Sequence, residues 1–323
     1  MPALTKEQLA ERRRHLGSSD APAVILDAAH RPFSPFEGHN PMSVYLSKVL
    51  DAQQPVTEAM ERGTWMEPYI VEWAAHALGD APIVEDPDKL YVVEQDRSGG
   101  VMAANLDGLL LKPVDGERAA IEAKFVGMRL ADRWGAEEMS DLVPDYVNLQ
   151  CQHQMACGGL GVIFVAAFIV TPWALERRLF RVPRSQPLID VMIRTEVDFW
   201  SRHVVPKVPP TEFVANVDLL RTIRRLAGKS VDLSSNEKAV AWAMLNQARR
   251  DAEKQEIEAL AALLGQMGDA EIARFADGSV FTIVEQKGPD IIDREAMRKA
   301  GVYGQFAREN RYRVPRYKPA KKP

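Results

Sequence analysis

Cysteines and long apolar runs are both scarce in this chain, and each absence excludes a class of protein. Among 323 residues there are only two cysteines, Cys151 and Cys157. Two thiolates cannot hold a four-cysteine iron–sulfur cluster, and their spacing on one predicted helix indicates core residues rather than a disulfide. No apolar run reaches the length that spans a bilayer, and no signal-peptide pattern is present at the N-terminus. We therefore expect a cytoplasmic protein that does not associate with membranes.

An excess of basic charge is also missing. The formal net charge is −4, whereas a protein that wraps nucleic acid by bulk charge is expected to be strongly basic. Any affinity for nucleic acid must therefore come from local patches, and basic residues gather at 12–14, 221–229 and 308–322. Such patches are also common on ordinary solvated surfaces, so alone they do not identify a partner.

Hydrophobic periodicity predicts a mixed α/β protein with a central mixed sheet flanked by helices. Expected helices are 5–15, 19–26, 40–50, 57–78, 145–158 and 185–204, and expected strands are 90–95, 101–112, 118–126, 161–170 and 175–182. Capping residues mark several helix starts: Thr5 with Gln8, Ser19, and Asn40 ahead of Pro41.

A proline-rich stretch at 206–210 predicts a boundary between a core, 1–205, and a C-terminal extension, 206–323. In the extension, Ser234 and Glu237 form a capping box for a helix that should run to Leu264 and stop at Gly265. A small hairpin, a short helix and the basic tail follow. This part shows no recognisable chemistry, and a structural or oligomer-forming arm is the simplest interpretation.

The residues most indicative of chemistry lie on strands 101–112 and 118–126, which turn residues between them join into a hairpin. Side chains alternate faces along a strand, so Glu122 and Lys124 share one face, and Asp107 can lie beside Glu122. Two carboxylates and an ammonium are costly to bury in an apolar sheet unless something occupies the space between them. Oxygen ligands of this kind suit Mg²⁺ or Mn²⁺, ions that typically act on phosphate esters.

A Glu-x-Lys triplet alone is not specific, and the chain contains a second copy, Glu285-Gln286-Lys287, with Asp277 shortly before it. The strand expected there, 279–287, is short and half polar, and Asp277-Gly278 is typical of a tight turn. The first copy lies in apolar strands flanked by helices, and we therefore prefer it. The alternative for Glu122 and Lys124 is a surface ion pair on a half-solvated strand.

Five motifs occur in an order that resembles a known family. They are Arg12-Arg13-Arg14-His15-Leu16-Gly17-Ser18-Ser19-Asp20, Gly63-Thr64-Trp65-Met66-Glu67-Pro68, Asp107-Gly108, Glu122-Ala123-Lys124, and Tyr146 with Gln150-Cys151-Gln152-His153-Gln154. Together they resemble the YqaJ-type viral recombinase family, to which phage lambda exonuclease is related, within the PD-(D/E)XK nuclease superfamily. The resemblance covers residues 8–205. Leu106 replaces the superfamily's proline, and the tryptophan often found ahead of the arginines is replaced near Leu9, but no charged group is lost.

The resemblance implies a restriction-endonuclease-like core and a metal-dependent enzyme that degrades one strand of duplex DNA from its 5′ end. The product would carry 3′ single-stranded overhangs for recombination. Asp107 and Glu122 would hold the metal with a backbone carbonyl near Ala123. Lys124 would orient or deprotonate the attacking water and offset charge on the phosphate.

The resemblance further implies a second metal ion, with Glu67 on a helix beside the sheet as its ligand. Gln150 would hydrogen-bond the water or a substrate phosphate. For both residues a solvent-facing helix position is the alternative. Tyr146 is one residue off the family's spacing and is expected at most to contact DNA, and His153 is expected to be a partly buried helix residue rather than a ligand.

Recognition of a terminal 5′-phosphate is expected from Arg12, Arg13 and Ser19. Ser19 would begin a short helix whose N–H groups attract an anion, and the arginines would face the same pocket. The alternative is a capping serine after a solvated arginine run. The expected partners are double-stranded DNA ends, a single-strand annealing protein, and further copies of the chain in a trimeric ring.

Two other functions remain open. The first is a DNA-end-binding or structural module that kept the fold and lost catalysis, although the intact Asp107, Glu122 and Lys124 argue against it. The second is a nonspecific endonuclease on the same core.

Overall fold

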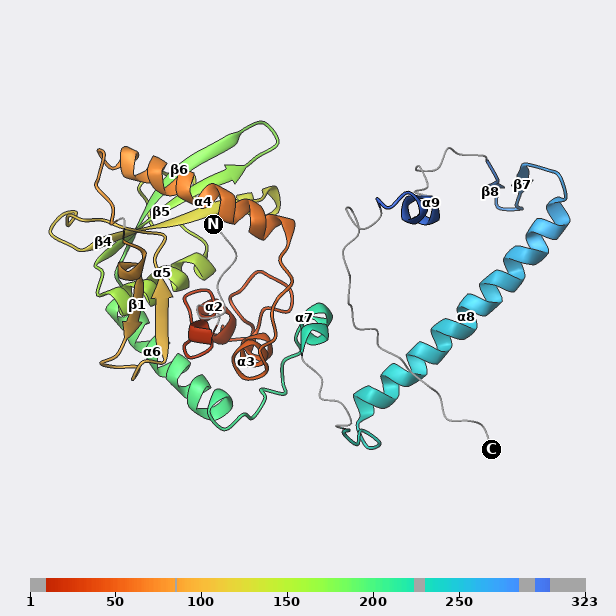
Figure 1. Ribbon diagram of the computed structural model, residues 1–323, viewed down its shortest axis with the longest axis horizontal. Coiled ribbons are helices and arrows are strands. Elements are labelled where there is room, and N and C mark those ends of the chain that lie inside the picture. The colour runs from red at the N-terminus through yellow and green to blue at the C-terminus, as the bar shows by residue number, and fades with distance from the viewer. Residues whose placement is uncertain (1–9, 85, 224–229, 285–293, 303–323) are drawn as a thin grey trace. The chain divides into compact units, whose positions relative to one another are not determined.

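The computed structural model describes residues 10–84, 86–223, 230–284 and 294–302. The chain divides into two compact units, Met1–Arg225 and Leu226–Pro323, whose elements are labelled in Figure 1. The first unit extends past the 205/206 boundary that the sequence predicts, because α7 (Val217–Thr222) adds Leu219 to one of its core clusters.

A four-stranded mixed sheet of order β3-β4-β5-β6 forms the centre of the first unit. Its strands are β3 (Gly108–Leu109), β4 (Ala119–Val126), β5 (Val162–Val170) and β6 (Leu175–Pro183). The β4–β5 pair is parallel and the other two pairs are antiparallel. A parallel pair needs a crossover connection, and α5 (Asp145–Gly158) lies in it. The predicted mixed sheet is therefore confirmed.

Helices cover both faces of this sheet, as Figure 1 shows for α4 and α5. Along β5 the side chains alternate, so that Phe164 belongs to one core cluster and Val165 to another. The helix α4 (Glu58–Ala77) packs Ile70 against the Phe164 face, and α5 packs Val147 against the Val165 face. The strand is apolar on both faces because each face is buried.

Smaller elements complete the first unit. They are α2 (Ala21–Val24), α3 (Pro41–Leu50), β1 (Tyr91–Glu94), β2 (Met102–Asn105), α6 (Gln186–Phe199), the 3₁₀ helices η1 (Pro87–Lys89) and η2 (Met128–Arg133), and the π-helical η3 (Trp200–Val204). The predicted cap of α3 is confirmed, since the Asn40 side chain accepts a hydrogen bond from the Ser43 backbone N–H and the Ser43 hydroxyl accepts one from the Asn40 backbone N–H. Thr57 likewise caps α4.

The predicted single strand 101–112 is wrong, because the chain breaks between β2 and β3. The strand β2 pairs with β1 in a separate two-stranded sheet, and β3 belongs to the main sheet. After the break Gly108 lies so close to α4 that a Cβ atom there would be 2.9 Å from Val71 Cγ1. The chain changes direction at this break, where α4 packs against Gly108 and Leu106 is buried, with 2 % of its surface exposed. Asp107 lies at the break.

The predicted Ser19 cap is also wrong. The N-cap of the four-residue helix α2 is Asp20, with no side-chain capping bond, and Ser19 is exposed. The carboxylate of Asp20 is already engaged, since it accepts a hydrogen bond from Gly17 N at 2.8 Å and lies 2.7 Å from Lys48 Nζ.

The second unit contains α8 (Glu237–Met267), the predicted hairpin of β7 (Ile272–Arg274) and β8 (Val280–Thr282), and α9 (Arg294–Lys299). Its long helix α8 begins two residues later than predicted, because Asn236 rather than Ser234 accepts the capping bond from Ala239 N. It also continues through Gly265, since a single glycine costs a helix only about 1 kcal/mol, and ends at Gly268.

Several sequence-based predictions concern residues that the structure does not describe. The capping box at Thr5, the second Glu-x-Lys copy at 285–287 and the tail 308–322 lie outside the described residues. Across the described ranges no helix combines the length and the apolar character that a bilayer crossing requires.

Candidate functional site

The β3–β4 hairpin brings Asp107 to Glu122. Gly108 pairs with Ile121 in antiparallel register, which places Asp107 opposite Glu122. The Asp107 Oδ2 atom accepts a hydrogen bond of 2.8 Å from the Ala123 backbone N–H. The predicted juxtaposition of the two carboxylates is therefore observed, although it arises at a strand break rather than within a long strand.

Glu122 and Lys124 project from the same face of β4, as strand alternation predicts. The Lys124 ammonium donates a hydrogen bond to Glu122 Oε1. The other carboxylate oxygen, Oε2, accepts a hydrogen bond of 2.6 Å from Gln154 Nε2. Glu122 is only 5 % exposed, so both of its oxygens are satisfied by protein donors in a nearly dry environment.

Gln154 is a site residue to which the sequence analysis gave no role. It belongs to the last motif, in which functional roles were predicted only for Tyr146 and Gln150. A signal was available, because Val147, Cys151 and Gln154 follow each other at helical spacing and Gln154 is thus a polar residue on an apolar helix face. A buried amide on such a face needs a partner, and Glu122 is that partner.

Electrostatic coupling joins Glu67 to this cluster. Burial raises the pKa of Asp107 well above its usual value, and the charges of Glu122 and Glu67 raise it further. Burial likewise raises the pKa of Glu67, and the charge of Glu122 adds to the effect. The acidic groups therefore repel one another across a shared, poorly solvated space.

The pKa of Lys124 shifts upward for the complementary reason. Burial by itself would lower the pKa, but the charges of Glu122 and Asp107 outweigh it. Lys124 is consequently held in its ammonium form at neutral pH. That state favours a role as hydrogen-bond donor and positive charge over a role as a base.

Gln150 and Tyr146 belong to α5, the helix that also carries Gln154. The Gln150 Oε1 atom is buried without a hydrogen-bond partner, so Gln150 does not point freely into solvent. Tyr146 is 8 % exposed, and its ring packs edge-to-face on Phe36 with centroids 6.1 Å apart. Burial raises the pKa of Tyr146, while the positive charges of Lys124 and Arg133 oppose the rise. Tyr146 is therefore a buried neighbour of the site.

His153 is fully buried rather than partly buried as expected. Its Nδ1 lies 3.0 Å from Glu196 Oε1 and its Nε2 lies 3.0 Å from the Ala103 carbonyl oxygen. Burial opposes the charged ring, but the charge of Glu196 prevails and raises the pKa of His153 well above its usual value. An imidazolium that donates to both oxygens cannot bind a metal, and it ties α5 to α6 and β2.

The residues expected to bind a 5′-phosphate only partly match that role. Arg12 and Ser19 are exposed, whereas Arg13 lies 3.4 Å from Asp51 in an ion pair. Lys48 approaches the same region, because its Nζ donates to the Arg12 carbonyl oxygen at 2.9 Å. In the described part of the chain no hydrogen bond or ion pair links Arg12, Arg13 or Ser19 to the acidic cluster.

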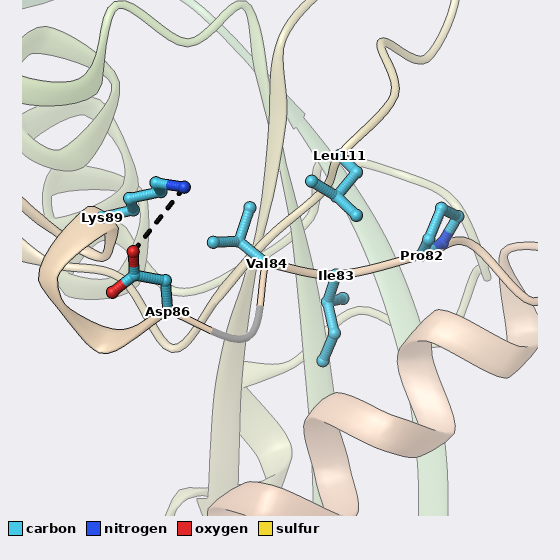
Figure 2. A pocket seen from close by; sticks show the side chains of 6 residues that line it. All are labelled: Pro82, Ile83, Val84, Asp86, Lys89 and Leu111. Atoms are coloured by element: carbon cyan, nitrogen blue, oxygen red, sulfur yellow. Dashed lines mark ion pairs between the residues drawn. The ribbon is translucent and has the colours of Figure 1, made fainter.

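A surface hollow of about 470 Å³ lies elsewhere in the first unit (Figure 2). Its walls are mostly apolar, with an ion pair of 3.6 Å between Asp86 and Lys89 at one side. The segment containing Ile83 forms a bridge to Leu110 and so covers the outer edge of β3. None of the predicted site residues lines this hollow, which therefore has no part in the chemistry proposed below.

The oxygen donors of the cluster have the chemistry of a divalent metal site. Among the described residues no group of three or more His, Cys, Asp or Glu side chains is arranged as a ready coordination shell. The donors that do gather are hard oxygens, the carboxylates of Asp107, Glu122 and Glu67. Burial and the charge of Glu122 raise the pKa of both Asp107 and Glu67, and a divalent cation would relieve this repulsion. The donor chemistry therefore fits Mg²⁺ or Mn²⁺.

Comparison with known proteins agrees with the motifs. Residues 8–161 match the family model described as the YqaJ-like viral recombinase domain. The "Uncharacterized protein YqaJ" of Bacillus subtilis (strain 168) is 24 % identical over 200 residues, which are 62 % of this chain. The alignment spans only 56 % of that relative's length.

Two solved structures are also similar. One is an alkaline exonuclease (LHK-Exo) from Laribacter hongkongensis, with 20 % identity, a TM-score of 0.46, and coverage of 63 % of this chain and 94 % of that chain. The other is LHK-Exo in complex with dAMP, with 20 % identity, a TM-score of 0.45, and coverage of 61 % and 91 %.

Proposed function

We propose that the chain is a metal-dependent 5′→3′ double-strand DNA exonuclease that leaves 3′ single-stranded overhangs for phage-type recombination. The observation that supports this most directly is the convergence of Asp107, Glu122 and Lys124 at the β2–β3 break, inside the part of the chain that matches the YqaJ-like viral recombinase domain. A surface ion pair would not require Glu122 to be 5 % exposed or Gln154 to hold its second oxygen.

In this proposal Asp107 and Glu122 hold a Mg²⁺ or Mn²⁺ ion, with a backbone carbonyl near Ala123 as a further ligand. Glu67 completes a site for a second ion. When bound, such an ion would supply Lewis-acid polarisation of the phosphate and an activated water. The protein's own contribution is to hold the carboxylates in register through the Ala123 and Gln154 hydrogen bonds.

Lys124 acts on the phosphate as a cation. Its raised pKa keeps it protonated, so it donates a hydrogen bond and offsets the charge that develops on the phosphate oxygens. Gln150, whose Oε1 lacks a partner, orients the water or a phosphate oxygen from the α5 side.

The direction of attack would depend on a terminal phosphate. Arg12 and Ser19 are the exposed groups available to it, with Arg13 joining them if its ion pair with Asp51 opens. A guanidinium is suited to a terminal phosphate, which carries more charge than an internal diester. A duplex with a 5′-phosphate should therefore be degraded faster than one with a 5′-hydroxyl, and Arg12→Ala with Ser19→Ala should erase the difference. Equal rates on both ends would remove this part of the proposal.

Two partners complete the proposed function. A single-strand annealing protein would take the 3′ overhang, and a trimeric ring of the nuclease units would keep hold of the duplex between cuts. Light scattering that shows only monomer, together with high processivity, would contradict the ring.

A digestion assay on linear and closed circular duplex, with Mg²⁺ and with EDTA, tests the function. The expected result is metal-dependent loss of the linear DNA only. Cleavage of the circle would favour a nonspecific endonuclease, and binding of DNA ends without cleavage would favour an inactive module. Calcium should support binding without turnover, because its longer and looser coordination does not match the reaction geometry.

Two substitutions test the site itself. Glu122→Gln and Lys124→Ala should each abolish hydrolysis while the thermal unfolding transition remains cooperative. Glu285→Gln, in the second Glu-x-Lys copy, is the matched control and should leave activity nearly unchanged. Retained cleavage in both site variants, or a dead Glu285→Gln enzyme, would overturn the assignment.

A further inference from the structure

The helix α8 is 31 residues long, and none of its side chains is buried in the described part of the chain. Large apolar side chains on it are exposed, with Leu245 70 %, Ile257 67 %, Leu260 40 % and Leu264 39 % accessible. Exposed apolar surface on this scale marks a contact surface. In proteins, most of a helix's stability comes from tertiary packing rather than from its own propensity.

One face of α8 carries a definite order of side chains. Steps of four, seven and four residues place Leu245, Arg249, Glu256 and Leu260 on the same stripe. Read along the helix, the stripe is apolar, then basic, then acidic, then apolar. Within the helix, the Arg249 guanidinium forms an ion pair with Glu253, one turn further along.

This order of side chains complements the same stripe on a second α8 helix that runs in the opposite direction. With two helices antiparallel and a two-fold axis between residues 252 and 253, Leu245 of each copy faces Leu260 of the other. Arg249 faces Glu256 in the next layer, and position 242 faces Leu263 at each end. A parallel pair would instead set Arg249 against Arg249 and Glu256 against Glu256, which like-charge repulsion disfavours.

We propose that α8 pairs with α8 of a second copy of this chain as an antiparallel, two-fold symmetric coiled coil. The order of charges identifies the partner of this stripe as a second α8, because the basic layer of one helix meets the acidic layer of the other twice by symmetry. The pairing is independent of the nuclease chemistry and does not rest on the proposed function. It joins chains through the second unit whatever assembly the first unit forms.

Charge reversal in the full-length chain tests the pairing. Arg249→Glu and Glu256→Arg should each raise the dissociation constant about 10-fold or more, because each creates two like-charge layers. The mass of each variant by light scattering should fall to half that of the native chain. An equimolar mixture should recover the native mass, because the Arg249→Glu chain carries two acids where the Glu256→Arg chain carries two bases.

The matched control reverses charges on the opposite face of the same helix. Lys254 and Glu258 lie 3.7 Å apart in an ion pair there, and Lys254→Glu or Glu258→Arg should leave the mass unchanged. Circular dichroism should show the same helix content in all variants. A native chain whose mass matches that of the Arg249→Glu variant, a mixture that fails to reassociate, or controls that dissociate equally would overturn the proposal.

Disulfide trapping tests the direction. Leu245→Cys chains mixed with Leu260→Cys chains should form the mixed disulfide under mild oxidation, and neither variant alone should cross-link. The native chain, whose Cys151 is buried, is the background control. Cross-linking of Leu245→Cys to itself in place of the mixed product would show parallel pairing and refute the antiparallel arrangement.

Discussion

Replacement of Gln154 by leucine removes a hydrogen bond that holds Glu122, a proposed metal ligand, in place. Gln154 Nε2 donates to Glu122 Oε2 at 2.6 Å, and the two residues are 2 % and 5 % exposed. Leucine has a similar volume, so the change removes the hydrogen bond and creates little cavity. A carboxylate oxygen has two lone pairs, so Gln154 can hold Oε2 while the same oxygen also meets a cation.

The expected loss follows from the type of bond. A hydrogen bond to a charged group contributes about 1.5–3 kcal/mol, and about 1.4 kcal/mol corresponds to a tenfold change in affinity. Gln154→Leu should therefore weaken divalent metal binding about 10- to 100-fold, because Glu122 is no longer held in its binding orientation. Calorimetric titration with Ca²⁺, which should bind without turnover, measures this apart from activity.

Gln152→Leu is the matched control. Gln152 is equally buried and lies on the same helix, but it bonds to Asn148, Pro183 and Ser185 rather than to Glu122. Its replacement should lower stability and leave Ca²⁺ affinity near the native value. An unchanged affinity in Gln154→Leu, or an equal loss in Gln152→Leu, would refute the positioning role of Gln154.

Three further outcomes are expected. In EDTA, Asp107→Asn should raise Tm at neutral pH, and the gain should vanish towards pH 4. Burial and the charges of Glu122 and Glu67 raise the pKa of Asp107, so the stability that comes with its protonated form is complete below the usual pKa of 3.8 and is lost as pH rises through the folded pKa. A lower Tm at pH 8 would contradict this. In denaturant unfolding, Glu196→Gln should lower the free energy of unfolding by about 3 kcal/mol at pH 6 and by less at pH 10. The stability from the pair of Glu196 with His153 is complete below pH 6.5 and is lost as pH rises through the raised pKa of His153. A loss that is the same at both pH values would count against a charged pair. Gly108→Ala should cost about 1–3 kcal/mol in urea unfolding, because its Cβ would lie 2.9 Å from Val71 Cγ1; an unchanged midpoint would show that α4 yields at this point.

Local pattern was sufficient for much of the first unit. The helix predicted at 145–158 coincides with α5, and the strand predicted at 118–126 contains β4, because each has a periodicity that its own side chains determine. The shared face of Glu122 and Lys124 follows from strand alternation alone. A polar cluster inside an apolar strand is visible in sequence because it breaks the local pattern.

The tertiary structure decided what depends on distant partners. Gln154 acts on Glu122 from 32 residues away, and His153 meets Glu196 from 43 residues away, separations at which no local pattern specifies a contact. The break after β2 arises where α4 packs on Gly108. At α2 the N-cap is Asp20, held by its ion pair with Lys48, rather than the predicted Ser19. Periodicity shows which face of an element is buried, but the packing of elements against each other determines which side chains meet there.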